Sequence, residues 1–301
     1  MKERIPSATA RMVTRGLIHL ACDPMLGSLV PPDLLQASLR FMEPERERAV
    51  ALLERMRNAR HRAFLALMER ITIPGIALHY LLRKRYLEEA AREALEAGYV
   101  QVVIIGAGFD SLAFRLHREY PTIRFIEIDH PATQQAKRAG LKALGGTDEN
   151  LRLIPLDLTR SSMERALIGS GMFDPALPAF FIAEGVTMYL PEKDVVSILR
   201  FVSGHDAAAR IAFTFMEPRA DGTIAFHNAT RLTGWWLRMK GEPFLWGIDR
   251  RELPRLLIAN GLQTLAVAHD ATLRGRYLPK EQRLNTPLAV GECICIAERT
   301  G

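Results

Sequence analysis

The feature that most constrains the fold is an alternation of short apolar runs with helix-like runs, which begins near residue 101. The first unit, "VVIIGAGFDSLAFRL" at 102–116, joins a β-branched run to a glycine turn and then to a helical pattern. Further strand-like runs follow at 124–128, 151–158, 179–185, 210–216, 262–268 and 292–298. Near-continuous apolar runs of this length are typical of strands buried on both faces of a parallel sheet. The alternation therefore predicts an α/β protein with a doubly wound, seven-stranded, mostly parallel sheet.

Three regions fall outside this alternation. Residues 1–98 have apolar residues near helical spacing and end at a glycine, which predicts an N-terminal helical cap over the carboxyl ends of the strands. The core would then be 99–301, with a lid insertion at 217–248. Residues 269–290 contain no obvious helix, and we expect the last two strands to form an antiparallel closing hairpin.

Composition excludes several classes of protein. No apolar run reaches the ~18 residues of a membrane span, and the first residues contain no apolar core of a signal peptide. The net charge of +6 comes from basic residues mixed with acids, and the aromatic residues do not interleave with them, so we expect neither a nucleic acid nor a membrane as partner. Three cysteines cannot form a disulfide framework, which favours the cytoplasm. Cys293 and Cys295 should be small buried hydrophobes on one face of a strand rather than metal ligands, and we expect no metal site.

The turn after the first strand distinguishes between two kinds of ligand. Gly106 and Gly108 let a ligand approach the backbone, at the edge where open α/β sheets bind ligands. A dinucleotide site would need a third glycine at position 111, but this residue is Ser111, and Asp110 would repel a pyrophosphate. The acidic turn favours a ligand with cationic groups, such as S-adenosylmethionine (SAM), which carries a sulfonium and an α-amino group.

Acidic residues also end the next three strand-like runs. Glu127 and Asp129 close the second run, Asp157 closes the third and Glu184 closes the fourth. A carboxylate after the second strand would accept hydrogen bonds from both ribose hydroxyls, which fits NAD as well as SAM. Asp157 would bind an adenine amino group, and Glu184 would face the reacting centre. Together the acids predict an anionic edge, although helix capping or an arginine partner would explain any single one.

The order of these motifs resembles one known family. The pieces are "SATA" (7–10), "DP" (23–24), "LRKRYLEEA" (82–90), "QVVIIGAGFDSLAFRL" (101–116), "FIEIDHP" (125–131), "PLDLT" (155–159), "AEGVTMYL" (183–190) and "GECICIAER" (291–299). They resemble the leucine carboxyl methyltransferase family of class I SAM-dependent O-methyltransferases, and in particular its bacterial branch. The resemblance implies the class I fold, SAM as cofactor and methyl transfer to oxygen.

Carried over by position, the resemblance implies a set of cofactor-binding residues. Arg83 would clamp the carboxylate of SAM, with Arg85 as a second candidate, and Ser7 and Thr9 belong to a segment that would close over the site. The implied set is Arg83, Gly106, Gly108, Asp110, Asp129, Asp157, Leu158 and Glu184. The chain departs from the branch at three motifs. It has Asp110-Ser111-Leu112 for Asp-Thr-Arg, Arg83-Lys84-Arg85 for Arg-Thr-Arg, and Glu88-Glu89 for Asp-Asp.

Methyl transfer from a sulfonium requires an aligned acceptor and the exclusion of water more than it requires an acid or base. A carboxylate acceptor is ionised already, whereas a phenol would benefit from a base. We take Glu184, Tyr189 and His227 as the candidate catalytic residues. Weaker candidates for a base are His79 and His205, and His130 should pack beside the cofactor.

The insertion 217–248 should shape the acceptor pocket. It contains aromatic residues and cations that suit a flat or apolar acceptor with an anionic group, although a lid packed on the N-terminal helices or a homodimer contact would explain them as well. These residues are Arg219, Arg231, Trp235, Trp236, Arg238, Lys240, Phe244 and Trp246.

The leading hypothesis is a SAM-dependent O-methyltransferase that acts on a carboxylate or hydroxyl of a small-molecule, secondary-metabolite-like acceptor. An NAD-dependent oxidoreductase and a non-catalytic protein that binds SAM or a partner are the alternatives.

Overall fold

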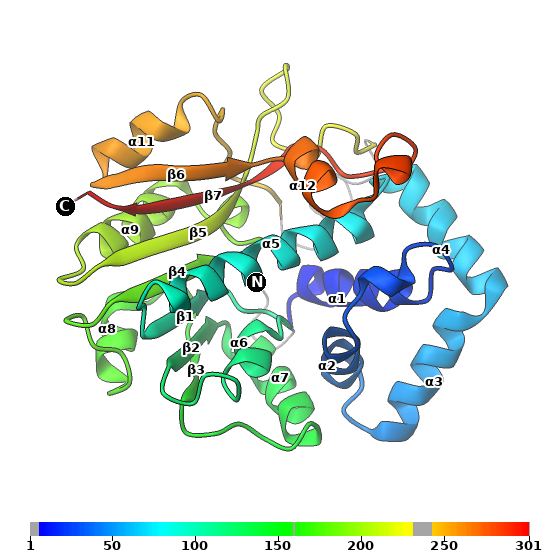
Figure 1. The fold of residues 1–301 in the computed structure, drawn as a ribbon, viewed down its shortest axis with the longest axis horizontal. Coiled ribbons are helices and arrows are strands. Elements are labelled where there is room, and N and C mark those ends of the chain that lie inside the picture. Colours follow the sequence, from blue (N-terminus) through cyan, green and yellow to red (C-terminus); the bar gives the residue numbers. More distant parts are fainter. Residues whose placement is uncertain (1–5, 159, 231–242, 301) are drawn as a thin grey trace.

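The computed structural model describes residues 6–158, 160–230 and 243–300 (Figure 1). Its centre is a seven-stranded sheet with the order β3-β2-β1-β4-β5-β7-β6. The strands are β1 (Gln101–Ile105), β2 (Arg124–Asp129), β3 (Leu151–Pro155), β4 (Ala179–Ala183), β5 (Ala209–Met216), β6 (Leu262–Ala268) and β7 (Glu292–Arg299). Only β7 runs antiparallel, and it pairs with both β5 and β6. The predicted seven-stranded, mostly parallel sheet and its antiparallel closing strand are confirmed.

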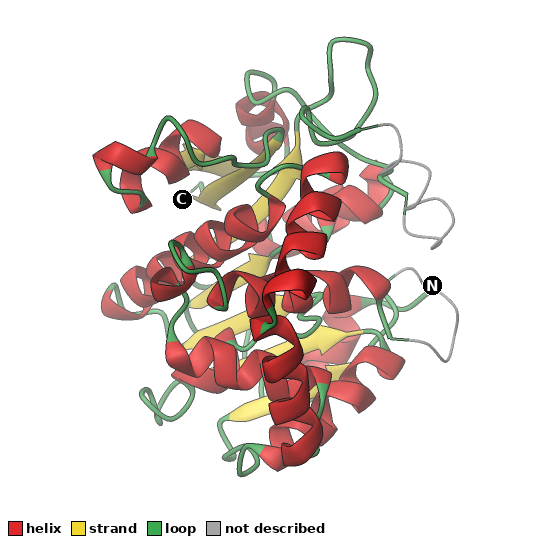
Figure 2. Cartoon of the chain, turned by 90° about the vertical axis from the view of Figure 1, so that its right-hand side faces the viewer, coloured by secondary structure: helices red, strands yellow, loops and turns green. Residues whose placement is uncertain are grey.

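Side chains of β1 alternate between two separate hydrophobic cores. Val102 and Ile104 pack into the first core, and Val103 and Ile105 pack into the second. The first core includes residues of α1 (Ala8–Ala21), α2 (Pro32–Met42), α5 (Ile76–Glu96), α6 (Leu112–Leu116), α7 (Pro131–Ala143) and α12 (Asp270–Tyr277). The second includes residues of α8 (Met163–Gly169), α9 (Glu192–Ser203) and α11 (Leu253–Ala259). Helices therefore cover both faces of the sheet, and Figure 2 shows the strands enclosed by them. This arrangement explains why the central strands β1, β4 and β5 are apolar at most positions.

The N-terminal third is helical, as predicted, but it does more than cover the carboxyl ends of the strands. The long α5 packs its apolar residues, such as Leu81 and Leu82, into the first core with Ile104 and Phe180. It therefore lies against a face of the sheet (Figure 1). The periodic segment from 47 to 71 forms two helices, α3 (Arg46–Arg57) and α4 (Ala59–Thr72), because the Asn58 side chain caps the second one. The division into a cap at 1–98 and a core at 99–301 stays a prediction.

Two details of the last third concern the sequence-based expectations. Cys293 and Cys295 are both buried in the second core, which confirms that they act as small hydrophobes on one face of β7. The expectation of no helix between β6 and β7 is wrong, because α12 lies there. This helix buries only Leu273 fully, so its sequence carries almost no apolar period.

Among the helices that the structure describes, none is by itself long and apolar enough to span a membrane; α4 and α5 reach that length and composition only as a pair bent by 83°.

Candidate active site

The carboxyl ends of β1 and β4 meet where the strand order reverses, which is where open α/β sheets bind their ligands. The turn after β1 needs glycine for two reasons. Gly106 and Gly108 have φ angles of +68° and +52°, in the left-handed region that other residues avoid. A Cβ on Gly106 would also lie 2.3 Å from Cγ2 of Val186, in the turn after β4. The two turns are therefore packed against one another without space for a side chain.

Asp129 joins the end of β2 to this glycine turn. One of its carboxylate oxygens accepts a hydrogen bond from the amide of Gly108, and the other accepts from the amide of His130. Burial raises the pKa of the Asp129 carboxyl, and the two amides oppose this effect. Glu127, the other acid of this run, is wholly buried and paired with Lys137, so it does not contribute to the edge of the sheet.

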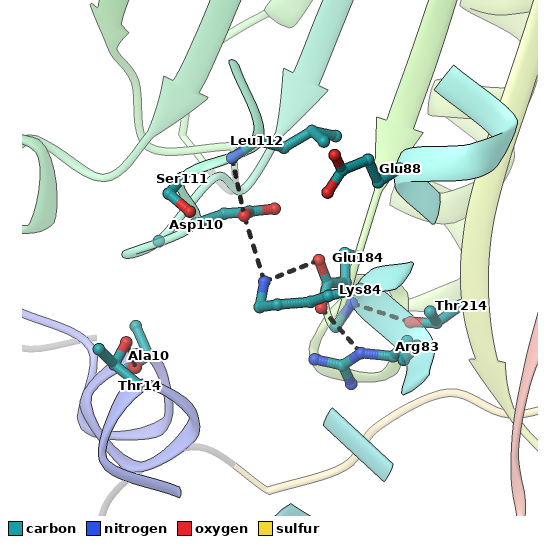
Figure 3. A network of polar contacts seen from close by, with 12 residues as sticks. Ala10, Thr14, Arg83, Lys84, Glu88, Asp110, Ser111, Leu112, Glu184 and Thr214 are labelled. Carbon is teal, nitrogen blue, oxygen red and sulfur yellow. Dashed lines mark hydrogen bonds and ion pairs between the residues drawn. The ribbon is translucent and has the colours of Figure 1, made fainter. Parts of the chain in front are cut away.

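A buried network of ion pairs lies beside the same turns (Figure 3). Arg83 and Lys84 come from α5, and each donates to Glu184 after β4: Arg83 Nε lies 2.9 Å from Oε1 and Lys84 Nζ lies 3.0 Å from Oε2. Lys84 Nζ also lies 3.3 Å from Oδ1 of Asp110. The next residue, Gly185, donates its amide to the hydroxyl of Thr214 on β5 at 2.8 Å, which fixes the turn that carries Glu184.

Two of the predicted acids, Asp110 and Glu184, are thus paired with cations of the protein. Burial raises the pKa of the Asp110 carboxyl, but the Lys84 ammonium and the more distant Lys137 and Arg115 outweigh burial, so this pKa lies well below its usual value. The predicted anionic edge is therefore largely neutralised by the protein itself.

Arg83 is fixed from its other side by Glu292, the first residue of β7. Its Nη1 lies 2.8 Å from both carboxylate oxygens of Glu292, and Glu292 Oε2 also lies 2.7 Å from His79 Nε2. Arg83 Nη2 has no acceptor among the described residues and faces Gly185, whose added Cβ would lie 3.5 Å away. The guanidinium is therefore held in one orientation with one nitrogen left to bind a carboxylate.

Glu292 should give the folded protein a measurable sensitivity to acid. Burial alone would raise the pKa of its carboxyl, but Arg83 and then His79 lower it to about 2. A carboxyl whose pKa is lower in the folded protein than in the unfolded chain stabilises the fold at any pH above its unfolded pKa. This stability is lost as the pH falls toward its folded pKa. From about pH 7 to about pH 3 we expect Glu292 to account for a loss of about 2 kcal/mol in the free energy of unfolding.

Urea unfolding of Glu292→Gln at several pH values tests this expectation. The variant should lose that part of the pH dependence, and Glu164→Gln, on the exposed surface of α8, should keep it. Identical pH dependence in native protein and Glu292→Gln would contradict the depressed pKa.

The other predicted cofactor residues come from the turn after β3 and from α5. Asp157 and Leu158 are in the turn after β3, half-buried, and the carbonyl of Asp157 accepts from the amides of Arg160 and Ser161. Arg85 is directed elsewhere, because its guanidinium lies over the ring of Tyr277 at 4.8 Å. This geometry does not support Arg85 as the second candidate, which stays a prediction.

The N-terminal segment does reach the site. Ser7 caps α1 by accepting from the amide of Ala10, and its own amide donates to Thr133 on α7. A Cβ on Gly108 would lie 3.3 Å from Cβ of Ala10, so the first turn of α1 covers the glycine turn. Thr9 belongs to the same turn.

The predicted catalytic and acceptor residues are dispersed. Tyr189 packs its ring 5.4 Å from that of Phe244, next to the third, smaller core. His227 is exposed, and its Nε2 lies 3.0 Å from the carbonyl of Glu217, so its role as a base stays a prediction without support from this geometry. His205 binds the carbonyl of Leu177 through Nε2 and is structural.

The insertion also differs from the expectation at two residues. The sequence predicts Trp246 in an acceptor pocket, but this residue is buried in the second core. The chain next to it is held at the end of β5, where the amide of Ile248 donates to the carbonyl of Met216. The Arg219 guanidinium is engaged by the carbonyls of Phe226 and Ala229. Arg231, Trp235, Trp236, Arg238 and Lys240 lie outside the described residues.

Two functional candidates escaped the sequence analysis: Lys84 and Glu292. The signal for both was present as a charge at a buried position. Lys84 ends a stretch of α5 that is buried at every residue from 77 to 84, and Glu292 opens the apolar run "ECICI". The sequence alone does not show which residue each charge pairs with, because partners such as Arg83 and Glu292 are 209 residues apart.

Comparison with known proteins identifies the family of the chain. The model of the leucine carboxyl methyltransferase family matches residues 8–203, about two thirds of the chain. The chain belongs to the leucine carboxyl methyltransferase family. The match includes Arg83, the glycine turn, Asp129 and Glu184, whereas Glu292 lies beyond it.

The curated relatives include proteins named "putative S-adenosyl-L-methionine-dependent methyltransferase", and two of them serve as examples. One from Frankia alni is 33% identical over 57% of this chain and 60% of the relative. One from Mycobacteroides abscessus is 31% identical over 68% of this chain and 69% of the relative. The chain thus spans about three fifths of the length of the first of these family members.

Solved structures support the fold. A protein from Thermobifida fusca, described as a methyltransferase, superposes with a TM-score of 0.55 at 18% identity, over 82% of this chain and 91% of that chain. A protein of the DUF574 family from Streptomyces avermitilis superposes with a TM-score of 0.54 at 13% identity, over 74% of this chain and 85% of that chain. The predicted class I architecture is confirmed by these likenesses, which concern the fold alone.

Proposed function

We propose that this family member is a SAM-dependent O-methyltransferase that acts on a carboxylate or hydroxyl of a small molecule. The observation that supports the proposal most strongly is Arg83, which two buried carboxylates hold beside the glycine turn with Nη2 still available. The donor set fits SAM: a guanidinium for its carboxylate, Asp110 and Glu184 for its ammonium, and Asp129 for its ribose. When bound, SAM supplies an activated methyl group on a sulfonium.

The protein's own residues would mainly bind and orient. Arg83 would hold the amino-acid end of the cofactor, and Asp157 with Leu158 would contact the adenine. The first turn of α1 would exclude water from the glycine turn, since it already covers Gly108. Orientation and exclusion of water are the contributions that an in-line methyl transfer needs most.

The acceptor side is proposed from Tyr189 and Phe244, whose ring centroids lie 5.4 Å apart beside the third core. An aromatic or carboxylate-bearing acceptor would suit this pair, and an ionised carboxylate would need no base. Glu184, Tyr189 and His227 stay candidates for contact with the acceptor, and a homodimer stays a proposal about the assembly.

Binding of S-adenosylhomocysteine (SAH), the demethylated product, tests the proposal by isothermal titration. Asp129→Asn should weaken SAH binding roughly 10- to 100-fold, because a hydrogen bond to a charged group contributes about 1.5–3 kcal/mol. The matched control is Asp206→Asn, which changes an exposed aspartate in the loop before β5 and should leave binding unchanged.

The alternatives make different predictions in the same assays. Folded protein that binds NADH but not SAH would favour the oxidoreductase. Binding of SAH without methyl transfer from SAM to any carboxylic acid or phenol of a panel, followed by mass spectrometry, would favour the non-catalytic protein.

A further inference from the structure

Lys84 lies between the two carboxylates that we propose for the α-ammonium of the cofactor. Its Nζ lies 3.0 Å from Oε2 of Glu184 and 3.3 Å from Oδ1 of Asp110 (Figure 3). The side chains of all three residues are less than a tenth exposed. The ammonium of Lys84 is therefore a buried cation between two buried carboxylates.

Three of the four oxygens of these two carboxylates already have partners within the protein. Glu184 Oε1 accepts from Arg83 and Oε2 accepts from Lys84. Asp110 Oδ1 receives both Lys84 and the amide of Leu112, which lies 3.0 Å away. A second ammonium group that bound between Glu184 and Asp110 would compete with Lys84 for the same oxygens.

The need for such a cation follows from burial. A carboxylate that is removed from water without a partner costs several kcal/mol, so the free protein needs a positive charge between Asp110 and Glu184. Lysine suits this task better than arginine would, because its ammonium is a compact charge on a flexible stem and can move. The α-ammonium of SAM and SAH is the same chemical group, with three donors and one positive charge.

We propose that Lys84 is an internal competitor for the α-ammonium of the cofactor: it neutralises Asp110 and Glu184 in the free protein and leaves Glu184 when the cofactor binds. The inference rests on the proposed function and concerns the affinity of the same site. Part of the binding free energy is then spent on breaking the Lys84 contacts, so the observed affinity is lower than the site would otherwise have.

Titration calorimetry of Lys84→Met with two ligands tests the inference at about pH 8, where the carboxylates stay ionised. SAH carries the α-ammonium, and methylthioadenosine shares the adenosine but lacks the whole amino-acid part. We expect SAH to bind roughly tenfold more tightly to the variant, and methylthioadenosine to bind as it does to the native protein. Lys193→Met, at an exposed position on α9, should change neither affinity.

A second variant allows for the possibility that Lys84→Met does not fold, which thermal unfolding would reveal. Lys84→Arg keeps a positive charge that is harder to displace, so SAH should bind no more tightly than to the native protein while methylthioadenosine binding stays unchanged. Weaker or unaltered SAH binding by folded Lys84→Met would overturn the inference, as would tighter SAH binding by Lys84→Arg. A native protein that binds methylthioadenosine and SAH equally would overturn it too. No SAH binding by the native protein would instead refute the proposed function, and this inference with it.

Discussion

Arg83→Met should abolish measurable binding of SAH and also destabilise the protein. The substitution removes the guanidinium that lies 2.9 Å from Glu184 and 2.8 Å from Glu292, and both carboxylates would stay buried. Breaking a buried ion pair on one side costs about 3–5 kcal/mol, because it leaves an uncompensated charge. The same change removes Nη2, the nitrogen that faces Gly185, so we expect SAH affinity to fall by roughly 100-fold or more.

The matched control is the neighbouring Arg85→Met. Arg85 shares the helix and the charge of Arg83, but its guanidinium packs over Tyr277. Calorimetry and urea unfolding should therefore show nearly native SAH binding and only a small loss of stability. Arg83→Lys adds a test of geometry: it keeps the charge without the planar fork, and we expect intermediate stability with weak binding. Equal losses of binding in Arg83→Met and Arg85→Met would contradict the assignment.

Most of the fold follows from the sequence because burial leaves a local trace. Strands such as β1 are apolar at almost every position, since Val102 and Val103 enter different cores, and this pattern placed the strand ends to within a few residues. Where an element buries few side chains, its sequence shows no apolar pattern from which it could be predicted. The helix α12 buries only Leu273 and was not predicted, and the break at Asn58 depends on a single capping side chain.

The site was predictable only in part, for a different reason. Glycines and acids at strand ends are local signals, and they placed Gly106, Asp129 and Glu184 at one edge of the sheet. Whether an acid faces a ligand or a cation of the protein depends on contacts between distant segments. Glu127 pairs with Lys137, and Glu184 pairs with two residues of α5, about a hundred positions earlier. Trp246 shows the same limit, because nothing in the tryptophan-rich stretch distinguishes a core residue from a pocket residue.

The tightest part of the site is Gly106, and Gly106→Ala should destabilise the protein by about 2–5 kcal/mol. A left-handed backbone costs an L-residue roughly 1–2 kcal/mol, and overpacking a tight contact costs about 1–3 kcal/mol. Both apply here, because φ is +68° and the new Cβ would lie 2.3 Å from Cγ2 of Val186. Since the turn after β4 carries Glu184, displacement of Val186 should also weaken SAH binding.

Gly98 allows the two costs to be separated. It has a φ of +92° at the end of α5, with open space where a Cβ would be, so Gly98→Ala should cost only the backbone part, about 1 kcal/mol. Combining Gly106→Ala with Val186→Ala should recover most of the steric part, because the remaining Cβ of residue 186 is 3.4 Å away. A double-mutant cycle measured by urea unfolding gives the coupling directly. If Gly106→Ala cost no more than Gly98→Ala, the turns after β1 and β4 could not be in the close contact on which the orientation of Glu184 depends.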